Sequence, residues 1–127
     1  MVKWLEPAQE RLPKPSVLVP IPLHRSRERS RGYNQSRVLA KLLAQRTGHR
    51  VVDGLVRTKA TVTQTGLDRS ARRKNVRDAF KWSAGPVPPS VILVDDVYTT
   101  GATMDAAAQA CRTAGIRRVH GLVVAKR

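Results

Sequence analysis

The stretch Val91–Thr103, with the sequence VILVDDVYTTGAT, decides the fold. Its first four residues are β-branched or aliphatic without interruption, which is typical of a strand buried on both faces of a parallel sheet. Two acidic residues follow, and a threonine-glycine turn then opens an alanine-rich helix, predicted from Thr103 to Ala114 and ended by Gly115. The stretch therefore predicts an α/β fold in which the chain passes from strand to helix at the carboxyl edge of a sheet.

The rest of the chain continues this alternation. We expect strands at Ser16–Val19, Val51–Val56 and Val119–Val124 and a helix from Asn34 to about Arg46. In that helix an apolar stripe is predicted to face the sheet, made by Val38, Leu39, Leu42 and Leu43. The remaining segments are predicted as a mobile loop over 57–69, a short basic helix over 70–79 and a turn-rich linker over 83–89. Right-handed crossovers then give a parallel sheet flanked by helices.

The length of 127 residues suits a single domain. Residues 1–15 are polar and contain three prolines, so we expect an arm that lies loosely on a domain formed by 16–127. No run approaches the roughly 20 apolar residues of a membrane helix. The amino terminus also lacks the hydrophobic core of a secretory signal. The sequence predicts a cytoplasmic protein with no membrane segment.

Charge and cysteine content limit the kinds of partner. The chain has 24 Lys and Arg against 9 Asp and Glu, a formal net charge of +15, which favours polyanions such as nucleic acid or phosphate esters. The single cysteine, Cys111, excludes an intramolecular disulfide, and its alanine-rich surroundings predict a small core residue. His24 and His120 have no partner at metal-ligand spacing, so we interpret both as structural or surface residues.

Asp95 and Asp96 are the first candidate site residues. Carboxylates placed beyond the end of a strand can accept hydrogen bonds from vicinal hydroxyls or bind a divalent cation. The turn that follows can hold a phosphate, because the N–H groups and dipole at a helix start favour anions. It consists of Thr99, Thr100, Gly101, Ala102 and Thr103. A strand end and simple helix caps explain any one of these residues, but the ordered set favours a phosphorylated ribose.

Two basic segments are candidates for anion contacts. In the first, Arg27, Arg29 and Arg31 lie between a predicted strand and a helix, where they could contact pyrophosphate or a nucleic-acid backbone. In the second, Arg72 and Arg73 belong to a stretch that could close over a site. A solvated charged loop and an exposed helix face remain the alternatives. Tyr33 is open to two interpretations, base stacking and packing at a helix start.

The sequence also resembles known families. VILVDDVYTTGAT is similar at all thirteen positions to the 5-phosphoribosyl 1-pyrophosphate (PRPP) motif of type I phosphoribosyltransferases. The segments VPIPLH, the residues from Arg27 to Gln35, and QTGLDRSARRKNVRDAF resemble the competence-associated ComF family. Together these similarities span about Val17 to Arg127. They imply the type I phosphoribosyltransferase fold, with a reduced amino-terminal part because the cysteine-rich zinc hairpin typical of ComF chains has no counterpart here.

The resemblance implies that Asp95 and Asp96 contact the ribose 2′ and 3′ hydroxyls or Mg²⁺, and that the turn from Thr99 to Thr103 holds the 5′-phosphate. One hypothesis is an enzyme that transfers phosphoribosyl from PRPP to an unknown acceptor with Mg²⁺ as cofactor. The other is a non-catalytic PRPP or nucleotide-binding module that also binds single-stranded DNA in competence and DNA uptake. The sequence leaves the acceptor open, and it leaves a homodimer as one of the open oligomeric states.

Overall fold

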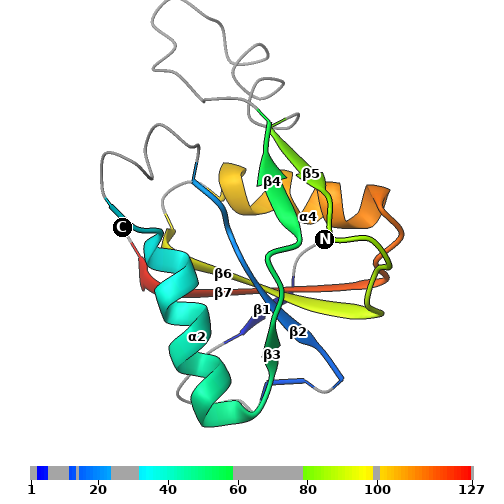
Figure 1. Ribbon diagram of the computed structural model, residues 1–127. Coiled ribbons are helices and arrows are strands. Elements are labelled where there is room, and N and C mark those ends of the chain that lie inside the picture. The colour runs from blue at the N-terminus through cyan, green and yellow to red at the C-terminus, as the bar shows by residue number, and fades with distance from the viewer. Residues whose placement is uncertain are drawn as a thin grey trace, which may run out of the picture.

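The computed structural model describes residues 3–5, 12–13, 15–23, 32–58, 79–98 and 101–126, and the structural statements below concern these ranges. They form a five-stranded sheet with the order β1-β7-β6-β2-β3, and every neighbouring pair in it is parallel (Figure 1). The strands are β1 (Lys3–Leu5), β2 (Val17–Pro20), β3 (Arg50–Val51), β6 (Ser90–Tyr98) and β7 (Arg118–Lys126). The predicted α/β fold with a parallel sheet is confirmed.

The centre of the sheet is β6, which is buried on both faces as its aliphatic run predicts. All four side chains from Val91 to Val94 are 0% exposed. Their directions alternate: Val91 and Leu93 belong to one hydrophobic cluster, and Ile92 and Val94 belong to a second cluster on the opposite face. Burying the strand on both sides fixes its register, because a slip of one residue would exchange the two faces.

A helix covers each face of the sheet (Figure 1). Helix α2 (Gln35–Thr47) packs against the cluster of Ile92 and Val94, and α4 (Ala102–Thr113) packs against the cluster of Leu93. The buried side of α4 consists largely of small side chains: Met104, Ala106, Ala107, Ala108 and Cys111. These small residues let the helix lie close to the sheet.

The predicted apolar stripe of α2 is only half correct. Leu39 and Leu43 pack against the core, whereas Val38 is 42% exposed and Leu42 is 51% exposed. Successive residues on a helix are separated by about 100°, so Val38 and Leu42 lie about 100° around the helix axis from Leu39 and Leu43. The sheet covers only the side of the helix that carries Leu39 and Leu43. Asn34 begins the helix as its N-cap and Gly48 ends it in the left-handed conformation, with φ of 79°.

The prediction of one strand over Val51–Val56 is wrong. The segment contains β3 at one end and β4 (Leu55–Arg57) at the other, and the two strands belong to different sheets. β4 pairs in antiparallel fashion with β5 (Phe80–Trp82), a strand that the sequence analysis did not predict. Gly54 separates β3 from β4, and an added Cβ there would lie 2.3 Å from the Trp82 ring. The indole therefore covers a position that only glycine can occupy without displacing it.

The remaining boundaries differ from the predictions in smaller ways. Residues Lys3–Leu5, from the segment predicted as a loose arm, form β1 and pair with β7 at the sheet edge. β7 begins one residue earlier than predicted and extends to Lys126. The predicted loop over 57–69 and the basic helix over 70–79 lie mostly outside the described residues, and Ala79 is in a turn rather than a helix.

Candidate functional site

Asp95 and Asp96 lie within β6 and not beyond its end, so the predicted strand boundary at Val94 is wrong. β6 continues to Tyr98 because its parallel pairing with β7 continues, up to the pair Tyr98 and Lys126. On the other side the pairing of β6 with β2 stops at Pro20 and Val94. The two acidic residues therefore extend past the end of β2, at the carboxyl edge where ligands bind in sheets of this type.

The start of α2 supplies a partner for the first of these carboxylates. The Ser36 hydroxyl donates to Asp95 Oδ1 at 3.1 Å, and the backbone N–H of Asp96 donates to the same oxygen at 2.9 Å. Ser36 was not among the site residues predicted from the sequence. The Asn-x-Ser pattern of a helix start was visible in the sequence, but the strand that this hydroxyl would meet was not.

The surroundings of Asp95 favour its protonated form. Burial is the main cause, and a side-chain hydrogen bond with Asp96 adds to it, so that the pKa of Asp95 rises from 3.8 to about 6. The hydrogen bonds from the Asp96 N–H and from Ser36 act in the opposite direction, because they stabilise the carboxylate. The charge of Asp96 raises the pKa of Asp95 further. A nearby cation would relieve this repulsion, and the pair is therefore suited to one.

The raised pKa of Asp95 predicts how stability depends on pH. The folded protein holds this proton more tightly than the unfolded chain, where the pKa is about 3.8. The resulting stabilisation is fully present below that value and is lost as the pH rises through about 6. We expect Asp95→Asn to remove this part of the pH dependence, measured as the free energy of unfolding in urea from about pH 4 to pH 7. Identical profiles for both proteins would contradict the assignment.

The turn that precedes α4 is described in part. Gly101 is the N-cap of the helix with φ of 80°, a conformation that favours glycine. Ala102 and Thr103 lie in the first helical turn, so the helix begins one residue earlier than predicted. Thr99 and Thr100 lie outside the described residues. In the sequence, Gly101 comes six positions after Asp95 and five after Asp96.

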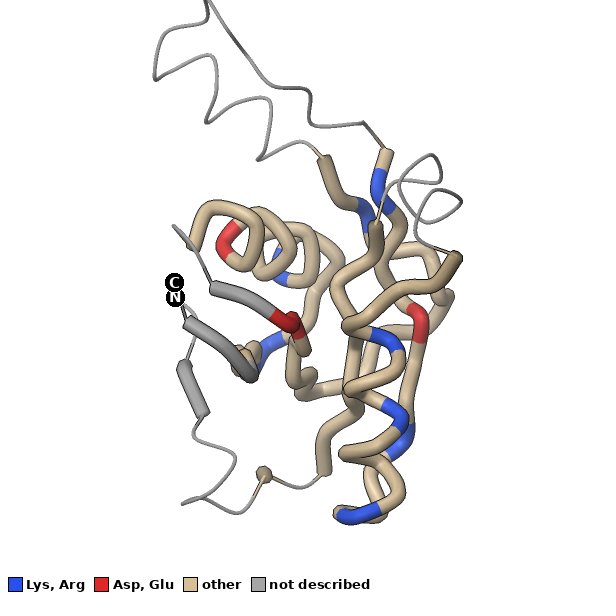
Figure 2. Tube along the Cα trace, turned by 90° about the vertical axis from the view of Figure 1, so that its left-hand side faces the viewer, with Lys and Arg blue, Asp and Glu red and all other residues tan. Residues whose placement is uncertain are grey.

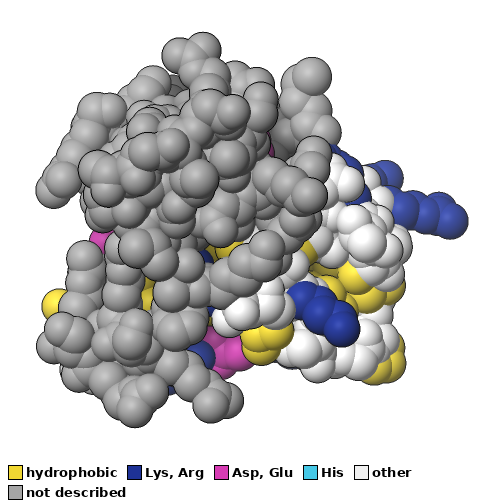
Figure 3. Space-filling view, turned by 90° about the horizontal axis from the view of Figure 1, so that it is seen from above, with side chains coloured by type: hydrophobic (Ala, Val, Ile, Leu, Met, Phe, Trp, Pro, Cys, Tyr) yellow, Lys and Arg dark blue, Asp and Glu magenta, His cyan; other side chains and the backbone are white. Residues whose placement is uncertain are grey.

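The predicted pyrophosphate or nucleic-acid contacts, Arg27, Arg29, Arg31, Arg72 and Arg73, all lie outside the described residues. Among the described residues, Lys and Arg positions are spread over α2, over the hairpin of β4 and β5, and over other elements (Figure 2). Several of their side chains project from the surface (Figure 3). Arg37 pairs with Asp53 at 3.1 Å, and the Arg57 guanidinium lies 5.1 Å from the centre of the Phe80 ring. Tyr33 is 53% exposed, so its ring is accessible to a ligand.

The other candidate side chains have structural roles. Cys111 is buried, and this burial raises its pKa to about 12, which keeps the thiol protonated and unreactive, as expected for a core residue. His120 is 8% exposed, and its Nδ1 lies 3.3 Å from the carbonyl oxygen of Val91. Within the described ranges, no group of three or more His, Cys, Asp or Glu side chains lies together as a candidate metal site.

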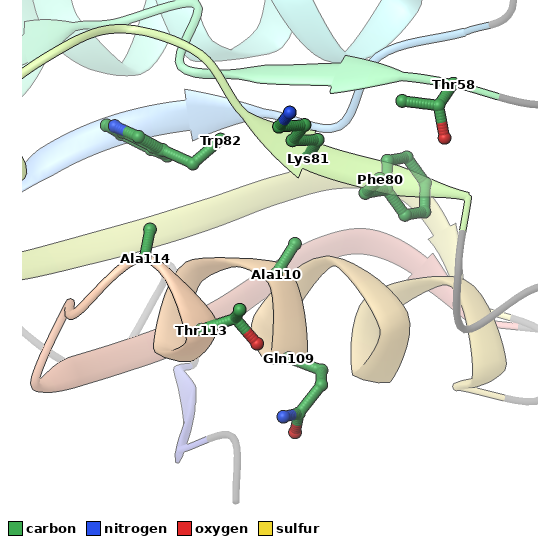
Figure 4. A pocket seen from close by; sticks show the side chains of 8 residues that line it. All are labelled: Thr58, Phe80, Lys81, Trp82, Gln109, Ala110, Thr113 and Ala114. Atoms are coloured by element: carbon green, nitrogen blue, oxygen red, sulfur yellow. The ribbon is translucent and has the colours of Figure 1, made fainter.

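A cavity of about 920 Å³ lies away from the carboxylates, between the hairpin and α4 (Figure 4). One wall comes from β5 and from Thr58, which follows β4, and the other comes from the carboxyl-terminal half of α4. The lining residues are Thr58, Phe80, Lys81, Trp82, Gln109, Ala110, Thr113 and Ala114. None of the predicted site residues that the structure describes lines this cavity.

None of the helices in the described part of the chain combines the length and apolar character that a membrane crossing requires.

Comparisons with known proteins identify relatives. The chain is 36% identical over 110 residues to competence protein F of Haemophilus influenzae, an alignment that covers 84% of this chain and 48% of the relative. It is 37% identical over 97 residues to DNA utilization protein YhgH of Escherichia coli, covering 75% and 42%. It is 37% identical over 95 residues to competence protein ComFC of Bacillus subtilis, covering 73% and 37%.

No family model matches the chain. The chain spans about half the length, or less, of the curated relatives that it matches. Their names support the resemblance to the ComF family and associate the relatives with competence and the use of DNA.

Proposed function

We propose that this chain is a ComF-type member of the type I phosphoribosyltransferase superfamily and that it binds PRPP together with Mg²⁺. One observation carries the proposal: adjacent carboxylates extend past the end of β2, and the glycine that starts α4 comes five positions after the second of them in the sequence. Carboxylates suit ribose hydroxyls, and the start of a helix suits the 5′-phosphate. The full agreement of Val91–Thr103 with the PRPP motif supports this division of roles.

The donor set of the site suits magnesium. Mg²⁺ is usually held by one or two carboxylates, while substrate phosphates and water complete its coordination. Asp95 and Asp96 would supply the protein oxygens, and the bound ion would neutralise charge on the pyrophosphate. Because protonation competes with ligand binding at Asp95, the pKa of about 6 favours binding at neutral rather than acidic pH.

As an enzyme, the protein would transfer phosphoribosyl to a nitrogenous acceptor. The bond between ribose C1 and the pyrophosphate oxygen breaks, and the electron pair leaves with pyrophosphate. The acceptor nitrogen forms the new bond to C1 and releases its proton to solvent. Positive charge develops on the ribose during this exchange, and the carboxylates of Asp95 and Asp96 would stabilise it electrostatically. Release of pyrophosphate in the presence of a panel of bases and amines tests turnover.

Thermal unfolding with PRPP and Mg²⁺ tests the binding proposal. A ligand at about 100 times its Kd stabilises the native state by about 2.7 kcal/mol, which raises the Tm of a domain of this size by on the order of 8 °C. The controls are Mg²⁺ alone and pyrophosphate with Mg²⁺. A basic protein binds many polyanions, so a rise in Tm no larger than that with pyrophosphate and Mg²⁺ would contradict a specific PRPP site.

A second candidate function is a module that binds single-stranded DNA during competence and DNA uptake, with PRPP or a nucleotide as a regulatory ligand. Two observations favour it: the formal net charge of +15 and the names of the relatives, which refer to competence and DNA utilization. Lys and Arg side chains that neutralise backbone phosphates bind nucleic acid with little regard to sequence. The exposed ring of Tyr33 could add base stacking.

A further inference from the structure

Hydrogen bonds join the end of β2, the start of α2 and β6 into a closed circuit. The Ile21 N–H donates to the Val94 carbonyl at 2.9 Å, and the Ile21 carbonyl accepts from Asn34 Nδ2 at 3.2 Å. Asn34 Oδ1 accepts from the Ser36 N–H at 2.9 Å, and the Ser36 hydroxyl donates to Asp95 Oδ1 at 3.1 Å. Val94 and Asp95 are neighbours in β6, so the circuit returns to the strand where it began.

Burial makes these bonds stronger and their loss more costly. Asn34 is 5% exposed and Ser36 is 3% exposed, so both polar side chains are almost completely removed from water. A buried donor that loses its acceptor costs more than a surface donor, because solvent cannot replace the partner. The Ser36 hydroxyl has a single hydrogen, and that hydrogen is directed to the Asp95 carboxyl.

Helix capping does not account for the Ser36 hydroxyl. The N-cap of α2 is Asn34, whose side chain already accepts the Ser36 N–H. The backbone of Ser36 thus serves the helix, while its hydroxyl reaches a residue on a strand 59 positions away in the sequence. A serine that served only to start the helix would not need a hydrogen bond to this carboxyl.

The two donors that reach Asp95 converge on one oxygen. Oδ1 accepts both the Ser36 hydroxyl and the backbone N–H of Asp96, and the carboxyl also has a side-chain hydrogen bond with Asp96. Two donors on one carboxyl oxygen, approaching from a helix and from the strand itself, restrict rotation of the carboxyl plane. The contacts thereby hold the whole carboxyl in one orientation.

We propose that Ser36 is a positioning residue, which holds the Asp95 carboxyl in the orientation that binds the ligand, and that Asn34 holds Ser36 in turn. This inference rests on the proposed PRPP site and adds to it a residue on a different element. Asp95 then contributes one oxygen to a ribose hydroxyl or to the cation. The start of α2 becomes part of the binding machinery without touching the ligand.

The test compares Ser36→Ala with Ser90→Ala. Ser90 is a matched control: it is 4% exposed, it lies at the opposite end of β6, and its hydroxyl forms a 2.7 Å hydrogen bond with Ser16. Both variants lose one buried hydroxyl, so both should unfold at a lower temperature. Only Ser36→Ala should weaken Mg²⁺-dependent PRPP binding in calorimetry, by about tenfold. Equal affinities in the two variants would overturn the proposal.

A ligand-free measurement separates this proposal from the PRPP site itself. If the wild-type protein does not bind PRPP, the proposed function fails, and the position of Asp95 is still testable by NMR of its side-chain carboxyl carbon. Ser36→Ala should shift this signal and raise the apparent pKa of Asp95, and Ser90→Ala should do neither. An unchanged signal in Ser36→Ala would overturn the positioning role. If Ser36→Ala does not fold, Ser36→Cys keeps the shape with a weaker donor and should change the signal in the same direction.

Discussion

Asp95→Asn combined with Asp96→Asn is expected to abolish Mg²⁺-dependent binding of PRPP. The double variant keeps the size of both side chains and removes the two negative charges that would contact the cation and the ribose hydroxyls. Isothermal calorimetry with PRPP, in the presence and absence of Mg²⁺, measures the effect. The loss should exceed a hundredfold in affinity, or about 2.7 kcal/mol.

Long-range electrostatics cannot mimic this result. The double variant raises the formal net charge above +15, and a more positive protein attracts an anion more strongly. Weaker binding would therefore have to come from lost local contacts. Asp53→Asn is the control, since it also removes one carboxylate but breaks only the surface pair with Arg37. Unchanged affinity in the double variant would remove Asp95 and Asp96 from the site.

Binding of single-stranded DNA should weaken steeply with salt if the second function is correct. Each phosphate neutralised on a single strand contributes about −0.7 to the slope of log affinity against log salt concentration. Contact with about five phosphates would reduce affinity about a hundredfold between about 50 mM and about 200 mM salt. Fluorescence anisotropy with labelled oligonucleotides of several sequences measures both this slope and any sequence preference.

A flat salt response would contradict binding through the DNA backbone. Tyr33→Ala separates stacking from charge, because it removes an exposed ring and leaves the net charge unchanged. We expect this variant to bind more weakly at every salt concentration, by about 1–3 kcal/mol if one base stacks on the ring, while the slope stays the same. A changed slope would show that Tyr33 acts through the arrangement of nearby cations.

The sequence predicted the centre of the fold better than its borders. Four consecutive β-branched or aliphatic residues favoured a strand for Val91–Val94, since a strand covered on both faces buries all of them. The end of β6 was not predictable, because its continuation to Tyr98 depends on pairing with β7, a segment more than twenty residues later. The break between β3 and β4 was missed for a similar reason. Gly54 and Trp82 explain it together, and they meet only in the folded chain.

The candidate site was also predictable only where its residues are close together in the sequence. Asp95, Asp96 and the glycine turn are contiguous, so their order in the sequence suggested a shared role. Ser36 was missed because its contact with Asp95 spans 59 positions and has no local pattern. The exposed Val38 and Leu42 show the opposite error: helical spacing grouped them with Leu39 and Leu43, but the flat sheet could cover only part of the stripe.

The short strands at the sheet borders have a consequence for aggregation. Within the described residues, β1 offers three residues and β3 offers two, whereas β6 and β7 have nine each. A strand from another molecule can add to a sheet only over the length of backbone that the outer strand presents. The aliphatic run of β6, which resembles the segments that seed amyloid, lies between β7 and β2 and is shielded from such templating.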